Sequence, residues 1–139
     1  MFYLADREEM QNIDRLTIEE DGIPGILLME RAAISTLEEI NSRMKQAPDG
    51  DGRNIYSEKN RPLMCLVVVE GGNNGGDGLA LARLLHQQGD QVQVCYIKGL
   101  TRVSESFERQ LGIVKKLGIE ILDTIPHRDY DVVVDGIFG

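Results

Sequence analysis

The stretch "VVVEGGNNGGDGLALARLL", residues 67–85, decides the fold. It opens with β-branched residues typical of a buried strand and passes through five glycines, two asparagines and an aspartate. It then continues with the leucine and alanine spacing of a helix. A glycine-rich turn between a strand and a helix is typical of parallel α/β sheets, and its unpaired N–H groups suit a ligand.

Strands and helices alternate on both sides of this turn. The strands are predicted at 63–69, 91–97, 119–122 and 131–135, and the helices between them at 77–88 and 104–117. Gly89 and Gly118 are placed to end the two helices. This order predicts a three-layer α/β/α sandwich with a mainly parallel, Rossmann-like sheet. In such sheets ligands bind at the carboxyl ends of the strands.

The amino-terminal part is predicted to form two helices within the same single domain, residues 1–139. The first covers about residues 7–20, after a capping pattern at Asp6 and Glu9. The second turns a mostly apolar face inward, formed by Leu28, Met29, Ala32, Ala33, Thr36, Leu37 and Ile40. Residues 47–62 combine prolines, glycines and charges without apolar periodicity, so they are predicted to form a surface loop.

Composition excludes several classes of function. The net charge of −8 disfavours a generic nucleic-acid binder, because a polyanion would be repelled. No apolar run approaches the roughly 18 residues of a membrane span. The acidic start lacks the pattern of a secretory signal, which predicts a cytoplasmic protein. Cys65 and Cys95 fall inside strand-like runs and are expected to be buried thiols.

The spacing of the glycines excludes the usual phosphate-binding motifs. The turn has no G-x-x-x-x-G-K-[ST] pattern, and its glycines do not match G-x-G-x-x-G in the standard phase. Asp77 is placed either to cap the helix or to contact a ligand, and as a carboxylate it would compete with an anion. Asn73 and Asn74 fit a tight turn, but their oxygens also suit a hard cation or a polar ring. Asp135, at the end of "DVVVD", is either a turn cap or a site residue.

The segment "GGNNGGDGLALARLL" strongly resembles the core motif of the YjeF N-terminal domain, the family of NAD(P)H-hydrate epimerases. The segments "EEMQNIDRLTIEEDGIPGILLMERAA" (8–33) and "DVVVDGIFG" (131–139) resemble other parts of that family in the same order. Three residues depart from its pattern: Glu70 replaces the first glycine of G-x-G-N-N, and Arg31 and Ala33 replace an asparagine and a glycine. The family domain continues beyond residue 139, so the resemblance implies a domain incomplete at its C-terminus and of little activity alone.

The resemblance implies an isomerase that interconverts the R and S forms of hydrated NADH and NADPH. Carried over by position, the residues expected to contact this cofactor are Asn73, Asn74, Gly75, Gly76, Asp77 and Gly139. Asn74 and Asp135 are expected to bind a potassium ion, and Asp135 is the candidate catalytic carboxylate.

Other assignments and partners remain open at the level of sequence. The resemblance also implies a fused or separate dehydratase as a partner, and a homodimer is possible. One alternative is a non-catalytic binding or dimerisation module like those in decapping-enhancer scaffolds. A second is a generic nucleotide-binding domain whose turn grips phosphate only.

Overall fold

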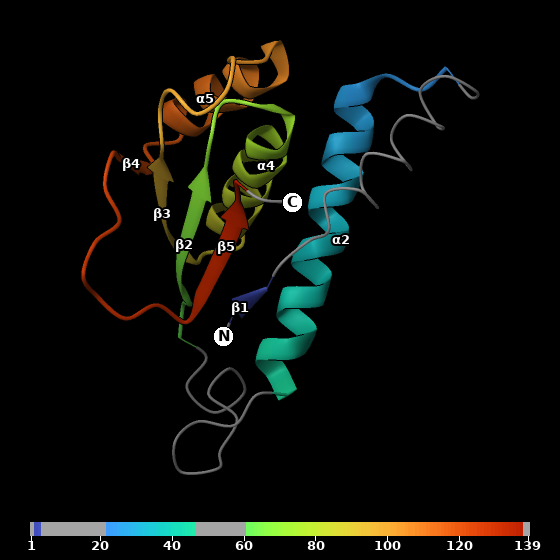
Figure 1. Ribbon diagram of the computed structural model, residues 1–139. Helices are drawn as coiled ribbons and strands as arrows, with labels where there is room; N and C mark the ends of the chain where they lie inside the picture. The colour runs from blue at the N-terminus through green and yellow to red at the C-terminus, as the bar shows by residue number, and fades with distance from the viewer. Residues whose placement is uncertain (1, 4–21, 47–60, 138–139) are drawn as a thin grey trace.

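The computed structural model describes residues 2–3, 22–46 and 61–137, and the statements below concern these residues. They form five strands and three helices (Figure 1). The strands are β1 (Phe2–Tyr3), β2 (Met64–Val69), β3 (Gln91–Tyr96), β4 (Glu120–Leu122) and β5 (Val132–Gly136). The helices are α2 (Gly25–Gln46), α4 (Asn73–Gln87) and α5 (Glu105–Lys116).

The strands pair in parallel in the order β1-β5-β2-β3-β4, which confirms the predicted parallel sheet. β2 is the central strand, with Val69 opposite Tyr96 of β3 on one side and Gly136 of β5 on the other. From β2 the chain moves outward to β3 and β4, and then returns to the opposite side of β2 as β5. The direction of the strand order therefore reverses between β2 and β5, which is where α/β sheets bind their ligands.

The three described helices all pack on one face of the sheet. Alternate strand residues, among them Val67, Val94 and Val134, point into one core with side chains of α2, α4 and α5. The intervening residues Leu66 and Cys95 point to the opposite face. These helices therefore supply one of the two helical layers that the three-layer prediction requires.

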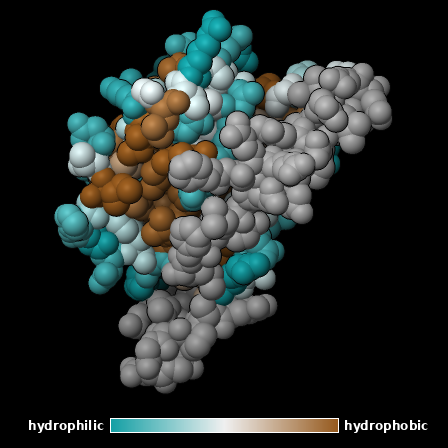
Figure 2. All heavy atoms as spheres, in the orientation of Figure 1, coloured by the Kyte–Doolittle hydropathy of each residue, from teal (hydrophilic) through white to brown (hydrophobic). Residues whose placement is uncertain are grey.

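The opposite face is covered in part by the segment between β4 and β5. Tyr130 packs against the cluster around Leu66 and Val68, and its hydroxyl donates to Gln93 Oε1 at 2.6 Å. Gln93 Nε2 in turn donates to Glu120 Oε2 at 2.7 Å. Figure 2 shows hydrophobic residues gathered on the viewer's side over β2 and β3.

Within the described residues, the predicted elements are confirmed in order and type, and one boundary is displaced by several residues. Helix α4 begins at Asn73, four residues earlier than predicted from the glycine count. The glycines predict a turn, but close packing against the sheet lets Gly75 and Gly76 form part of the first turn of the helix. Gly89 and Gly118 follow the ends of α4 and α5 with φ of 102° and 74°, as expected for helix-terminating glycines. The predicted helix 7–20 and most of the predicted 47–62 loop lie outside the described residues.

Both cysteines are buried and unpaired to each other, as predicted. Burial raises the pKa of the Cys65 thiol far above its ordinary value, because the thiolate would lose its hydration. No described helix is long and apolar enough to cross a membrane.

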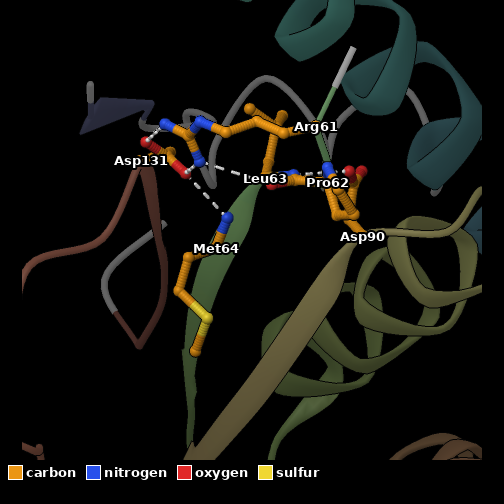
Figure 3. A network of polar contacts seen from close by, with 6 residues as sticks. All are labelled: Arg61, Pro62, Leu63, Met64, Asp90 and Asp131. Atoms are coloured by element: carbon orange, nitrogen blue, oxygen red, sulfur yellow. Dashed lines mark hydrogen bonds and ion pairs between the residues drawn. The ribbon is translucent and has the colours of Figure 1, made fainter. Parts of the chain in front are cut away.

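A polar network joins the amino ends of β2 and β5 (Figure 3). Arg61 donates to both carboxylate oxygens of Asp131 at 2.9 Å. The backbone N–H of Met64 also donates to Asp131, at 2.8 Å. Beside them, Leu63 N donates to the buried side chain of Asp90 at 2.9 Å, which ties β2 to the turn before β3. The network holds the strands in register at the end of the sheet opposite the glycine-rich turn.

Gly75→Ala is expected to destabilise the protein by about 3 kcal/mol, because a rigid backbone would have to move. A Cβ at residue 75 would lie 1.7 Å from the carbonyl oxygen of Glu70. Gly112→Ala is the matched control, since its Cβ meets nothing within 4 Å in α5. That variant should gain about 0.5–1 kcal/mol from helix propensity. Urea unfolding measures the free energy of unfolding of both variants. Equal values for Gly75→Ala and Gly112→Ala would contradict the close approach of residue 75 to Glu70.

Asp131→Asn is expected to lower the free energy of unfolding by about 1 kcal/mol at pH 7, since Arg61 is partly exposed. The pKa of Asp131 is lowered, chiefly by the hydrogen bond from Arg61. A carboxyl group whose pKa is lower in the folded state stabilises the protein at pH values above its pKa in the unfolded state. This stabilisation is lost as the pH falls through the pKa of the folded state. The difference between the two proteins should therefore shrink below about pH 4.

Urea titrations at pH 7 and pH 3 test this dependence, with the exposed Asp129→Asn as control. A difference of the same size at both pH values would show that the ion pair does not carry the effect.

Candidate functional site

Three of the predicted site residues line one pocket between α4, α2 and the carboxyl end of β5. Asn74 and Asp77 come from α4, and Asp135 from the end of β5. The pocket is partly open to solvent, and about 30 Å³ inside it is accessible to a water molecule. It lies where the strand order reverses, so residues about 60 positions apart in the sequence share one site.

Two glycines keep the elements around this pocket close together. A Cβ on Gly78 would lie 2.9 Å from Val69 Cγ1, and one on Gly136 would lie 2.8 Å from the carbonyl oxygen of Val68. Real Cβ contacts are longer, so a side chain at residue 78 would push α4 from β2, and one at residue 136 would disturb the pairing of β5 with β2. Gly78 thus sets the distance between α4 and the sheet, and Gly136 sets the distance between β5 and β2.

Asn74 presents an amide nitrogen whose hydrogen-bonding capacity is not used within the described residues. Its Nδ2 atom is buried and has no hydrogen-bond partner there. A buried, unsatisfied amide group costs about 1–3 kcal/mol of stability. Such a cost is typical of a group whose partner is a ligand.

Asp135 has the turn-capping interaction that the sequence allowed. Its Oδ1 accepts a hydrogen bond from the backbone N–H of Ile137 at 2.8 Å. This bond fixes one carboxylate oxygen, so the orientation of the side chain at the rim of the pocket is set. The capping role and the ligand-binding role are therefore compatible.

Asp77 does not cap α4, so the first of its two predicted roles, that of a helix cap, is wrong. The N-cap of α4 is Gly72, which makes no side-chain cap hydrogen bond, and the first turn holds no acidic residue. Asp77 lies in the second turn, because α4 begins at Asn73. There it lines the pocket.

The remaining predicted site residues lie elsewhere. Asn73 is exposed at the start of α4 and does not line the pocket. Gly75 and Gly76 are buried within the first turn of α4, where Gly76 packs against Met29 of α2. Gly139 is outside the described residues.

Helix α2 forms the other wall of the pocket, which the sequence did not assign to the site. Ala32, Ala33 and Thr36 all line it. Thr36 is oriented by its own hydroxyl, which donates to the carbonyl oxygen of Ala32 at 2.9 Å. These residues belong to the predicted inward face of this helix. Helical periodicity, however, does not distinguish a residue that packs in the core from one that lines a pocket. Arg83 of α4 pairs with Glu30 and joins the two helices.

The donor set favours a weakly bound hard cation or a polar ligand over a transition metal. The described residues contain no group of three or more His, Cys, Asp or Glu side chains able to hold a metal. The pocket instead offers two carboxylates and an amide on apolar walls. These groups accept and donate hydrogen bonds to a polar ring, and their oxygens suit hard cations.

The fold and the position of the pocket define a Rossmann-like α/β domain with a small-molecule site at its topological switch point. The family profile described as YjeF-related protein N-terminus matches residues 25–139. The chain therefore belongs to the YjeF-related N-terminal family.

Named relatives agree with this assignment. The chain is 39% identical over 132 residues to the NAD(P)H-hydrate epimerase of Weissella koreensis. The aligned region covers 94% of the chain and 53% of that protein. It is 37% identical over 139 residues to the NAD(P)H-hydrate epimerase of Leuconostoc mesenteroides, which covers 100% of the chain and 56% of that protein. The chain thus spans about half the length of these relatives.

A solved structure shares the fold. The crystal structure of yeast ynu0 superposes with a TM-score of 0.69 at 22% sequence identity. The match covers 99% of this chain and 57% of that one. It supports the Rossmann-like α/β architecture of the described residues.

Proposed function

We propose that this chain contributes to the interconversion of the R and S forms of hydrated NADH and NADPH, a step of nicotinamide cofactor repair. The observation that carries the proposal is the similarity along the chain to relatives named NAD(P)H-hydrate epimerase, at 39% and 37% identity. Because the chain spans about half of their length, the activity of the whole protein is part of the proposal.

The pocket has the chemistry that this reaction requires. Loss and return of the C6 hydroxyl, or opening of the ring, develops positive charge at the nitrogen of the reduced nicotinamide. A carboxylate nearby stabilises that charge, and Asp135 lies at the rim of the pocket with one oxygen held by the Ile137 N–H. Asp135 is therefore the proposed catalytic carboxylate. The apolar wall of α2 limits the access of water to the ring.

Asn74 and Asp77 are proposed to position the ring. The buried Nδ2 of Asn74 would donate to a polar group of the ligand, which would satisfy an atom that has no partner in the described residues. Asp77 faces the same pocket from the next turn of α4 and would accept from a hydroxyl. Orientation by groups on a rigid helix reduces the entropy lost at the transition state.

Two groups of the pocket are also proposed as ligands of a potassium ion. The amide oxygen of Asn74 and the carboxylate of Asp135 would be two of its ligands, since hard monovalent cations take oxygen donors. A half-turn of the Asn74 amide exchanges its oxygen and nitrogen, so the buried position can present either. When bound, the cation would supply a fixed positive charge that orients Asp135 and the ligand.

Asp135→Asn is expected to weaken binding of hydrated NADPH at least about tenfold, because the charge that complements the ring nitrogen is lost. Calorimetric titration measures the affinity, and chromatography of the R and S forms measures interconversion. Asp129→Asn, at an exposed position of the segment before β5, removes the same charge away from the pocket and should change neither quantity. ADP should bind more weakly than hydrated NADPH.

Two results would contradict the proposal. Equal affinity for hydrated NADPH in the Asp135→Asn and unaltered proteins would remove Asp135 from the site. Preference for ADP over the hydrated cofactor would instead favour a generic nucleotide-binding domain.

The potassium site predicts a cation-specific stabilisation that Asn74→Ala abolishes. The unaltered protein should melt at a higher temperature in KCl than in a tetramethylammonium salt of the same ionic strength, because only the native state binds the ion. Asn41→Ala is the control, because the Asn41 amide is hydrogen-bonded to Gln88 outside the pocket. Differential scanning fluorimetry measures the shift. The same potassium effect in Asn74→Ala and in the unaltered protein would refute the assignment.

A further inference from the structure

Thr36 is the only described residue of α2 that brings a polar side chain to the pocket of Asn74 and Asp135. The other α2 residues that line the pocket, Ala32 and Ala33, have apolar side chains. The Thr36 hydroxyl donates its hydrogen to the backbone carbonyl oxygen of Ala32 at 2.9 Å. A hydroxyl oxygen also has lone pairs that accept hydrogen bonds, so Thr36 offers the pocket a neutral acceptor.

Asn74 supplies a donor to the same pocket from the other helix. Its Nδ2 atom is buried and has no hydrogen-bond partner within the described residues. Helices α2 and α4 pack against each other, so the acceptor of Thr36 and the donor of Asn74 line one pocket from two helices. A ligand group that satisfies both must accept a hydrogen bond at one atom and donate one at another.

The size and the charge of the pocket limit which group this is. The volume of about 30 Å³ that is accessible to a water molecule is roughly two to three times what one water requires. It therefore admits a terminal group of a few atoms, while the ring that carries this group lies at the open mouth. The other polar side chains of the pocket, Asp77 and Asp135, are carboxylates. They repel an anionic group and accept a neutral one.

We infer that the pocket binds the carboxamide of the nicotinamide, whose carbonyl oxygen accepts from Asn74 Nδ2 and whose NH2 group donates to Thr36 Oγ1. A primary amide presents an acceptor and a donor side by side, whereas a carboxylate has no donor and a ketone has only the acceptor. Thr36 is therefore a specificity-determining residue that selects the amide. In this orientation the amide oxygen of Asn74 remains for the cation proposed above. The inference rests on the proposed function, because it takes a nicotinamide cofactor as the ligand.

Free nicotinamide is the probe, because it requires this pocket and not the rest of a dinucleotide. Its matched partner is 3-acetylpyridine, in which a methyl group replaces the NH2 and the carbonyl is kept. The unaltered chain should bind nicotinamide about tenfold more tightly than 3-acetylpyridine, and it should bind nicotinate more weakly than either. NMR titration of the isotope-labelled chain gives the affinities. Binding of nicotinamide should shift the side-chain N–H signals of Asn74, which are identified by their loss in Asn74→Ala.

Thr36→Val removes the acceptor and keeps the size of the side chain, so the preference for nicotinamide over 3-acetylpyridine should fall to about twofold or less. Thr36→Ser keeps the hydroxyl and should keep the preference. Thr124→Val makes the same substitution at an exposed position between β4 and β5 and should also leave the preference unchanged. If Thr36→Val does not fold, the comparison of the three ligands on the unaltered chain still tests the inference.

Three results would overturn the inference: equal affinities of the unaltered chain for nicotinamide and 3-acetylpyridine, an unchanged preference in Thr36→Val, or no measurable binding of nicotinamide. Failure of the protein to interconvert the R and S forms of hydrated NADPH would count against the proposed function alone, since the comparison of the small ligands does not depend on that reaction.

Discussion

The close approach of α4 to the central strands is the constraint on which the rest of the structure depends. Side chains at Gly75, Gly78 or Gly136 would each meet backbone or strand atoms at less than 3.0 Å. With glycine at these positions, the helix lies directly on β2 and β5. Asn74 and Asp77 of the helix then line one pocket together with Asp135. The glycines thus have a structural role, and the chemical role is proposed for the polar residues beside them.

Much of this arrangement was predictable from the sequence because it follows from local patterns. Apolar runs without alternation identified the buried strands, and Gly89 and Gly118 marked the helix ends with positive φ. The predicted start of α4 was wrong, because a run of glycines indicates a turn. Tertiary packing makes the same residues helical. The wall formed by Thr36 and the contact between Thr101 and Glu70 were missed, because contacts between distant segments leave no local pattern.

The two sides of α4 have different chemical character. On the β5 side, carboxylates and an amide line an open pocket suited to a polar ring. On the β3 side, the buried carboxylate of Glu70 accepts a hydrogen bond from the hydroxyl of Thr101. The two carboxylates of the pocket favour hydroxyl donors and developing positive charge over an anion. The net charge of −8 has the same sign as these groups.

A crystal structure of the chain with hydrated NADPH tests the central claim most directly. The account predicts that the hydrated nicotinamide ring lies between Asn74 and Asp135, with a polar atom of the ligand within hydrogen-bonding distance of the Asn74 amide. A ring bound outside this pocket, with the Asn74 amide still without a partner, would contradict it.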